Sequence, residues 1–351
     1  MDPYGSAGVR NPFPPFSPVP LAKDVVFSLP TGLTFFREDW GVGYSQSWNL
    51  TVERQMTGNL LLRVAYVGNK GTHLQSFRER NAAVYRKGAT LTDTDARRPL
   101  YPNYASMVEM VSDGNSHYHA LQVTLERRFS RNFSFLAFYS FSKSIDDESI
   151  NAQFTLANPN PYDPRFNRGL SDFDVPHNFR LTGIYDLPRL AGSHGFIRNV
   201  LGGWTITEIV DWRSGLPFSL TSGRDNSFSG VGQDRADITG DPALPMDRER
   251  KDIIRNFFDK SAVTANAVGT FGNSPRNLLR QLSYFNVDSG IHKRFNLTER
   301  YRLQVRGEFF NTLNNVHLSR PGNNQSATAS FGVVSGAGSP RIALVSLKVQ
   351  F

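Results

Sequence analysis

Three groups of acidic or histidine side chains have the residue types that bind metal ions. Asp146, Asp147 and Glu148 are consecutive, and hard cations bind clustered carboxylates. His117 and His119 are two residues apart on a predicted strand, so both would lie on one face, but no third ligand accompanies them. A further set of aspartates lacks the regular spacing of a calcium loop and comprises Asp225, Asp234, Asp237 and Asp241. We expect solvated carboxylates here, with no metal site and no cofactor.

The motifs of covalent catalysis are missing from the sequence. It contains no Gly-x-Ser-x-Gly, no His-Glu-x-x-His and no phosphate-binding glycine loop before a helix. Cysteine is absent, which excludes thiol catalysis, disulfides and cysteine metal sites. We therefore expect that this chain is not an enzyme.

The charged residues best suited to contact a solute are on the strand predicted for Tyr301 to Asn311. Arg302, Arg306 and Glu308 alternate there with apolar or small residues, so all three share one face. In the wall of a barrel that face points into the lumen, where charges can contact a passing solute. The same charges could instead pair with neighbouring strands or with a plug. We take the three residues as candidate solute contacts.

The last stretch of the chain, Arg341 to Phe351, shows a period of two. One of its faces is apolar and the other, with Ser346, Lys348 and Gln350, is polar; the apolar face comprises Ala343, Val345, Leu347, Val349 and the terminal Phe351. An edge strand of a soluble sandwich would show the same alternation. A barrel wall in an outer membrane requires it, because one face meets lipid and the other the lumen.

The same alternation predicts eight further strands. They are expected at Tyr44 to Gln55, Leu60 to Val67, His117 to Phe129, Phe133 to Lys143, Asn178 to Asp186, Trp204 to Arg213, Tyr284 to Arg294 and Tyr301 to Asn311. In the sixth of these, Glu208 falls on the face of Trp204 and Val210, so we expect a bulge or a shifted register.

The connections between these strands alternate in length. Short or moderate turns follow every second strand, and the long connections are Gly68 to Ser116, Ser144 to Pro176, Ser222 to Ser283 and Thr312 to Pro340. We expect these four to be loops, with one helical turn at Asp252 to Phe258. Outer-membrane barrels show this pattern, with short turns at the periplasmic rim and long loops outside, whereas soluble sandwiches seldom contain four such loops.

Composition agrees with a strand-rich membrane wall. Aromatic residues make up 12% of the chain, and there are 29 glycines and 20 prolines, which favours strands joined by turns. No run of eighteen apolar residues occurs and the mean hydropathy is −0.38, which excludes a helical membrane span. The net charge of +8 is scattered and forms no nucleic-acid motif; a basic surface also suits acidic lipopolysaccharide.

The first 43 residues are predicted to be a Pro/Gly-rich loop, with residues 44–351 as the barrel portion. We expect no signal peptide within residues 1–20, since they contain a Pro-Phe-Pro-Pro-Phe run in place of an apolar core. Nine strands is an odd number, and bacterial single-chain barrels have an even one. Val25 to Phe36 could supply a tenth strand, or further strands could lie upstream.

Several ordered motifs stand out along the chain. They are Ala65-Tyr66-Val67-Gly68-Asn69-Lys70-Gly71-Thr72-His73-Leu74, Arg168-Gly169-Leu170-Ser171-Asp172-Phe173-Asp174-Val175-Pro176-His177, Ser214-Gly215-Leu216-Pro217-Phe218, Gly272-Asn273-Ser274-Pro275-Arg276-Asn277, Asn286-Val287-Asp288 and Arg306-Gly307-Glu308-Phe309-Phe310-Asn311 with Asn314. Together these motifs resemble the barrel of TonB-dependent receptors, most closely the Oar-like group that carries a carboxypeptidase-regulatory-like domain. The resemblance covers nearly the whole chain.

This resemblance implies an all-β, antiparallel transmembrane β-barrel of 22 strands, of which the chain would form an incomplete part with nine or ten strands. It implies a plug and a TonB box, which we do not find in the sequence, so contact with the TonB complex would require a missing N-terminal part. It also implies that Phe351 ends the signal that the barrel-assembly machinery recognises.

The sequence thus predicts the barrel portion of an outer-membrane receptor or transporter for a large solute, possibly a saccharide or a peptide. Its surroundings would be outer-membrane lipid and lipopolysaccharide, with no nucleic-acid partner. Two alternatives remain open: a self-contained small outer-membrane barrel with an adhesive or structural role, and a secreted soluble β-rich binding protein.

Overall fold

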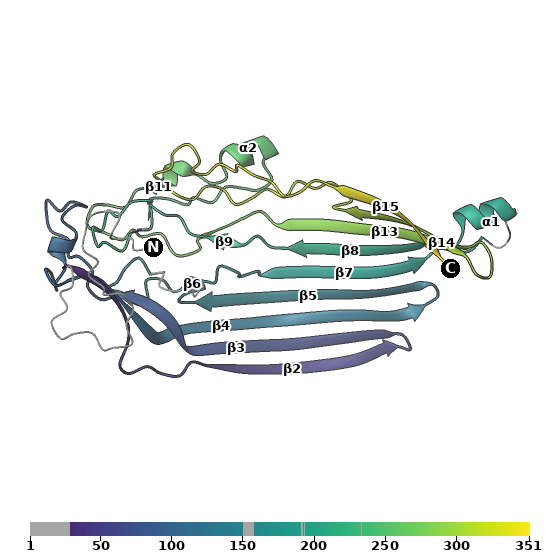
Figure 1. The fold of residues 1–351 in the computed structure, drawn as a ribbon, viewed down its shortest axis with the longest axis horizontal. Helices are drawn as coiled ribbons and strands as arrows, with labels where there is room; N and C mark the ends of the chain where they lie inside the picture. Colours follow the sequence, from purple (N-terminus) through teal and green to yellow (C-terminus); the bar gives the residue numbers. More distant parts are fainter. Residues whose placement is uncertain (1–28, 150–157, 191, 193, 233) are drawn as a thin grey trace, which may run out of the picture.

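Nine long strands form a single antiparallel sheet in the computed structural model, which describes residues 29–149, 158–190, 192, 194–232 and 234–351 (Figure 1). The strands are β2 (Tyr44–Thr57), β3 (Leu60–Glu79), β4 (Tyr104–Ser130), β5 (Phe133–Asp146), β7 (His177–Asp186), β8 (Thr205–Arg213), β13 (Tyr284–Asn296), β14 (Arg302–Phe310) and β15 (Ile342–Gln350). All nine predicted strands are therefore confirmed. No helix in the described part of the chain has both the length and the apolar character to span a membrane.

The sheet is open in the described residues. Its order is β15-β14-β13-β8-β7-β5-β4-β3-β2, so each long strand pairs with its sequence neighbours and the two outermost strands, β2 and β15, do not pair with each other. An open antiparallel sheet of this order is the arrangement expected for part of a barrel wall. The predicted fold class, an all-β antiparallel barrel wall present in part, is confirmed.

The two faces of the sheet keep their character from one edge to the other. At one edge Val305 lies opposite Leu347, and at the other Val52 lies opposite Val64, so apolar residues share a face. The neighbouring positions place Arg63 opposite Glu53 on the other side. Because paired residues point to the same face, the register produces one apolar face and one polar face. We use these two names below.

The prediction of a loop from Gly68 to Ser116 is wrong over much of that length. β3 and β4 continue past the predicted ends and remain paired as far as Glu79 opposite Val108. Register shifts occur on either side of Leu74. In this extension both faces carry polar residues, and therefore the alternation that marks a lipid-facing strand is lost while the backbone pairing continues.

The predicted tenth strand is only partly present and does not extend the wall. β1 (Thr31–Phe36) pairs with β4 in parallel, Thr31 lying opposite Tyr104 and Phe36 opposite Met110. β1 therefore pairs along the edge of the β4 extension, beyond the end of β5. Residues 25–28 of this prediction lie outside the described residues.

The bulge predicted around Glu208 is absent. β8 pairs with both β7 and β13 without a register shift, and Glu208 keeps its place on the apolar face. Its carboxylate accepts a hydrogen bond of 2.7 Å from the Ser289 hydroxyl of the neighbouring strand. This partner accounts for the polar residue without a change of backbone.

The long connections of the C-terminal half pack together into a compact unit, which we call the loop unit (residues 217–282 and 312–340). It contains β9 (Pro217–Phe218), β10 (Asp237–Ile238), α2 (Arg250–Arg255), β11 (Val263–Thr264) and β12 (Leu279–Arg280). The helix overlaps the helical turn predicted at Asp252 to Phe258 but begins and ends earlier. Its core comprises Phe218, Leu220, Ala236, Ile253, Phe257, Phe258, Val263, Leu279, Phe331 and Val334. The two structureless loops predicted for this region are therefore corrected to an ordered unit with its own core.

The opposite end of the sheet carries the short turns, and we call it the short-turn end. The connection from β7 to β8 contains a helix there, α1 (Gly195–Leu201), which lies at the same end as the C-terminus (Figure 1). The sequence analysis predicted only a moderate connection at this place. α1 is seven residues long, too short to show helical periodicity in sequence.

Candidate functional site

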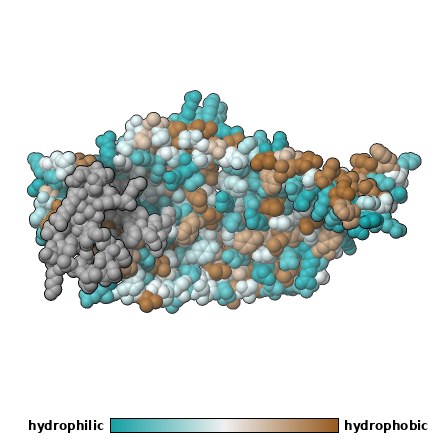
Figure 2. Space-filling view, in the orientation of Figure 1, coloured by the Kyte–Doolittle hydropathy of each residue, from teal (hydrophilic) through white to brown (hydrophobic). Residues whose placement is uncertain are grey.

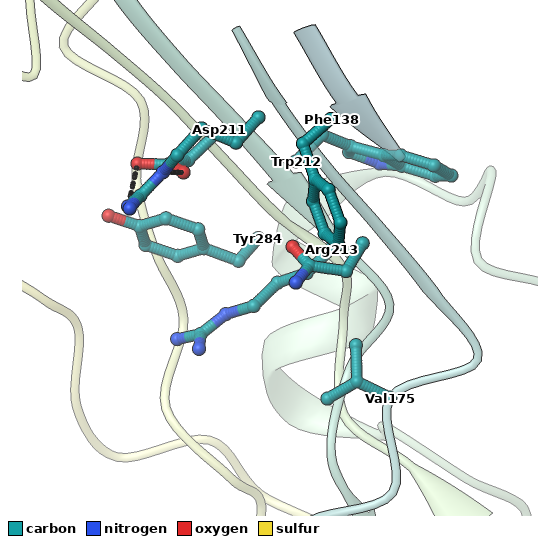
Figure 3. A pocket seen from close by; sticks show the side chains of 8 residues that line it. Phe138, Val175, Asp211, Trp212, Arg213 and Tyr284 are labelled. Atoms are coloured by element: carbon teal, nitrogen blue, oxygen red, sulfur yellow. Dashed lines mark hydrogen bonds and ion pairs between the residues drawn. The ribbon is translucent and has the colours of Figure 1, made fainter. Parts of the chain in front are cut away.

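A pocket opens on the polar face of the sheet, close to the loop unit (Figure 3). It has a volume of about 520 Å³, and we call it the lumen pocket. The lining residues come from β5, β7, β8, β13 and the connection before β7, and comprise Phe138, Val175, Asn178, Arg180, Asp211, Trp212, Arg213 and Tyr284. In a barrel wall the polar face encloses the lumen, so a solute inside the barrel can reach this pocket.

The strand register brings the polar side chains of the pocket together. Arg180 of β7 lies directly opposite Asp211 of β8. Arg213 of β8 lies opposite Asn178 on one side and opposite Tyr284 of β13 on the other. These residues are distant in sequence. Alternate positions of a strand share one face, and only the pairing of the three strands brings these residues together on one surface.

The charges in the lumen pocket are only partly neutralised. Arg180 donates two hydrogen bonds to Asp211, of 2.5 Å from Nε and 3.0 Å from Nη2. The guanidinium carbon of Arg213 lies 4.9 Å from the centre of the Tyr284 ring, and Arg213 has no ion pair with any residue that the structure describes. The two arginines and one aspartate leave one positive charge on a surface that also carries the rings of Phe138 and Tyr284. Such a surface can bind a carboxylate or a hydroxyl-rich solute.

Buried ion pairs tie the loop unit to the wall beside the pocket. Arg276 donates to Asp146 at the end of β5 with a distance of 2.6 Å between Nη1 and Oδ1, and both side chains are buried. Arg280 donates to Asp174, whose side chain is also buried. Both contacts cross from the loop unit to segments that flank β5 and β7. They fix the loop unit to the end of β5 and to the segment before β7.

Burial shifts the pKa of several groups at the loop end. It raises the pKa of Glu148 to about 7, the charge of Arg276 opposing this effect. Oε1 of Glu148 is buried without a hydrogen-bond partner in the described residues. Burial also raises the pKa of Asp234, and it lowers that of Arg235 to about 10 with help from the charge of Arg276.

The aspartates considered for metal binding have other partners in the structure. Asp146 pairs with Arg276, and Asp147 with Arg168 at 3.1 Å. The four aspartates of the later stretch, Asp225, Asp234, Asp237 and Asp241, accept hydrogen bonds from backbone N–H groups. Within the described ranges no three His, Asp or Glu residues form a group that could hold a metal ion.

The predicted histidine pair lies on the apolar face of β4. Nδ1 of His119 lies 2.8 Å from the Tyr66 hydroxyl, and the two rings stack with their centres 6.2 Å apart. Trp48 packs on the same histidine at 6.0 Å. These contacts give His119 a structural role in an aromatic cluster.

The candidate solute contacts on β14 are on the polar face as predicted, but they do not line the lumen pocket. Arg306 forms an ion pair of 2.8 Å with Glu308. Arg302 lies opposite Gln350 near the short-turn end. Phe351 follows β15 and has 87% of its surface exposed. Solute contact by the three charged residues and recognition of Phe351 during assembly remain predictions.

The sequence analysis did not identify Arg180, Asp211, Arg213 or Tyr284 as site residues. The strands that carry them were predicted, but not these side chains as a group. The missing information was the register between β7, β8 and β13, which decides that these residues are neighbours. A polar face with an arginine and an aspartate on successive strands is the signal that could have pointed to them.

Comparisons with known proteins agree with this architecture. The family model described as outer membrane beta barrel domain matches residues 2–343. The outer membrane transporter YddB from Escherichia coli is similar in structure, with a TM-score of 0.51 and 12% identity over 91% of this chain and 34% of that one. No curated protein sequence matches the chain.

Two receptors give weaker structural matches. The ferric-catecholate import receptor Fiu from Escherichia coli K12 has a TM-score of 0.41 and 10% identity over 90% of this chain and 28% of that one. The ferripyoverdine receptor of the Pseudomonas aeruginosa outer membrane has a TM-score of 0.43 and 11% identity over 88% and 27%. The chain thus spans about a third or less of the length of these proteins. It belongs to the outer membrane beta barrel domain family, and its location is the outer membrane.

Proposed function

We propose that this chain is the C-terminal part of the barrel of a TonB-dependent receptor of the Oar-like group, which binds or takes up a large solute such as a saccharide or a peptide. The observation that carries the proposal is the lumen pocket, which lies on the polar face beside an ordered loop unit. The open order of the sheet supports a larger barrel to which these strands contribute.

The pocket supports binding without covalent chemistry. Arg213 offers a guanidinium without a carboxylate partner in the described residues, and the amide of Asn178 lies on the neighbouring strand. Tyr284 and Phe138 supply aromatic surface on which a sugar ring or an apolar side chain can pack. Several contacts of this kind give selectivity while allowing the solute to leave again.

Energised uptake is a proposal for the whole receptor. It would require a plug and a segment that contacts the TonB complex, together with assembly into the outer membrane by the barrel-assembly machinery. The alternative of a self-contained small barrel would require pairing of β2 with β15, and these strands do not pair in the structure.

Binding of defined probes by the full chain in outer-membrane vesicles tests the proposed function. The probes are an acidic oligosaccharide (oligogalacturonate), a neutral one (maltoheptaose) and a hexaglutamate peptide, each measured by titration calorimetry. We expect the acidic probes to bind, and Arg213→Gln to weaken their binding about 10- to 100-fold because a charged hydrogen bond contributes about 1.5–3 kcal/mol.

A matched control comes from the same face of the sheet. Arg63→Gln removes an arginine that already pairs with Glu53 on β2 and β3, away from the lumen pocket. This variant should bind the acidic probes as the unchanged chain does. The proposal is refuted if none of the probes binds, or if Arg213→Gln and Arg63→Gln have the same effect.

A further inference from the structure

The short-turn end of the sheet carries a basic pocket on its apolar face. It has a volume of about 610 Å³ and lies between α1, the residues that flank it and the end of β13. The lining residues are Arg189, Arg198, Asn199, Gly202, Gly203, Lys293, Arg294, Phe295, Asn296 and Leu297. Four of them are cationic and none is acidic. We call this the rim pocket.

Lys293 holds α1 against the apolar face. Lys293 lies opposite Val305, on the face that meets lipid, yet its side chain is buried. Its ammonium donates to the backbone carbonyl oxygens of Asn199, at 2.5 Å, and of Gly202. It also lies 4.9 Å from the centre of the Phe295 ring. The carbonyl groups at the C-terminal end of the helix thus satisfy a charge that would otherwise face hydrocarbon.

The segment around α1 is closely packed and leaves little freedom of position. Trp204 donates from Nε1 to the carbonyl oxygen of Val200 at 2.8 Å. A Cβ atom at Gly202 would lie 2.5 Å from the carbonyl oxygen of Arg189, so only glycine fits there. The rim pocket is therefore a formed feature of the fold.

Two arginines, Arg198 within α1 and Arg189 in the segment before it, lack acidic partners in the described residues. Neither Arg189 nor Arg198 forms an ion pair with any residue in the described ranges. Arg294 also lines the pocket, but the strand alternation directs it to the polar face, so the argument rests on the other two. Two unpaired guanidinium groups at the edge of a lipid-facing surface attract an anion.

The surroundings of the rim pocket are apolar. Phe196 of α1 is 78% exposed, and Leu201 and Leu297 are exposed as well. Figure 2 shows hydrophobic side chains gathered at this end of the molecule, where α1 and the C-terminus lie in Figure 1. A helix with exposed apolar and basic side chains beside a membrane surface lies at the boundary between headgroups and acyl chains.

A second basic pocket lies at the same end and on the same face, between the β2–β3 and β4–β5 turns. It has a volume of about 590 Å³ and is lined by Arg127, Arg131 and Phe135 among others. Nε of Arg127 is buried and has no hydrogen-bond partner in the described residues. Cationic and apolar residues therefore lie together at two places along the short-turn end of the sheet.

From these observations we propose that the rim pocket binds the phosphodiester headgroup of an anionic phospholipid of the periplasmic leaflet, with Arg189 and Arg198 contacting the phosphate and Phe196, Leu201 and Leu297 contacting the acyl chains. The short turns of an outer-membrane barrel face the periplasm, which places this end at that leaflet. The proposal depends on the membrane location and is independent of the solute in the lumen pocket.

Native mass spectrometry of the full chain tests the proposal. The chain is released from nanodiscs containing equal amounts of phosphatidylglycerol and phosphatidylcholine, and the retained lipid is counted. We expect selective retention of phosphatidylglycerol. The double variant Arg189→Gln/Arg198→Gln should reduce its apparent affinity about 30-fold, which is about fivefold for each basic residue near the membrane surface.

Three controls distinguish lipid binding in the rim pocket from a folding defect, a general effect of surface charge and the binding of a free anion. The double variant Arg189→Lys/Arg198→Lys keeps both charges and should keep the selectivity, which excludes a general folding defect. Arg224→Gln/Arg320→Gln removes two arginines of the loop unit, at the opposite end of the sheet, and should have no effect. Inorganic phosphate at about 10 mM, where salt screens exposed charges only weakly, should not displace the lipid.

Three results would overturn the proposal. The first is equal retention of the two lipids by the unchanged chain. The second is unchanged selectivity in Arg189→Gln/Arg198→Gln, or an equal loss in Arg224→Gln/Arg320→Gln. The third is displacement by inorganic phosphate, which would identify a site for a free anion.

Discussion

Replacement of Arg276 by alanine should release the loop unit from the barrel wall. Arg276 donates to Asp146 at 2.6 Å, to Ser149 at 2.6 Å and to Asp172 at 3.1 Å. In Arg276→Ala the carboxylate of Asp146 stays buried without its cation. Removal of one partner of a buried ion pair costs about 3–5 kcal/mol. Since about 1.4 kcal/mol corresponds to a factor of ten, the open form of this contact should become about 10²- to 10³-fold more populated.

Limited trypsin digestion of the full chain measures this opening. The loop unit contains exposed cleavage sites within α2, among them Lys251 and Arg255. Cleavage follows the population of the open form when opening and closing are fast. The cleavage rate of Arg276→Ala should therefore rise by the same factor, while the barrel wall remains folded as judged by its migration on gels before and after heating.

Two further variants make the experiment decisive. Arg306→Ala breaks the exposed ion pair with Glu308, and such pairs contribute about 1 kcal/mol or less, so cleavage should change only a few-fold. Asp146→Asn/Arg276→Met removes both buried charges and should regain much of the protection. If Arg276→Ala is cleaved no faster than Arg306→Ala, the buried ion pair does not hold the loop unit on the wall.

Two more predictions concern pH and assembly. Because the pKa of Glu148 is raised to about 7 from its ordinary 4.5, the folded chain binds more protons than the unfolded chain between these values, and stability falls as pH rises through that window. Hydrogen exchange near Glu148, corrected for its intrinsic pH dependence, should be slower at pH 5 than at pH 8, and Glu148→Gln should remove the difference; an equal difference in the variant argues against this cause. Deletion of Phe351, which is largely exposed, should impair assembly of the full-length receptor into the outer membrane much more than solute binding, and normal assembly would contradict its role.

The barrel wall was predictable because the membrane imposes a strict pattern on each strand. Lipid requires apolar residues on one face of strands such as β14 and β15, and this requirement is visible in sequence. The pattern ends where β3 and β4 continue past their predicted ends, and the prediction of a loop failed there. Glu208 broke the pattern within the wall, but its partner Ser289 comes from another strand and could not be inferred from local sequence.

The loop unit and the lumen pocket depend on contacts between distant residues. Phe218, Phe258 and Phe331 form one core although they belong to separate connections. Arg180 and Asp211 become partners only through the register of β7 and β8. Single-sequence patterns record the local period of a strand and carry no information about which strand lies beside it.

Accessibility of single cysteines tests the central claim most directly, which is that one face of this sheet meets lipid and the other the lumen. The chain has no cysteine, so each introduced thiol is the only one. Gln122→Cys and Thr182→Cys lie on the polar face of β4 and β7, and Val123→Cys and Leu181→Cys lie on the apolar face. In outer-membrane vesicles a water-soluble maleimide should label the first two, and label the second two only after denaturation. Equal labelling of both pairs in the membrane, or the reverse preference, would contradict the account.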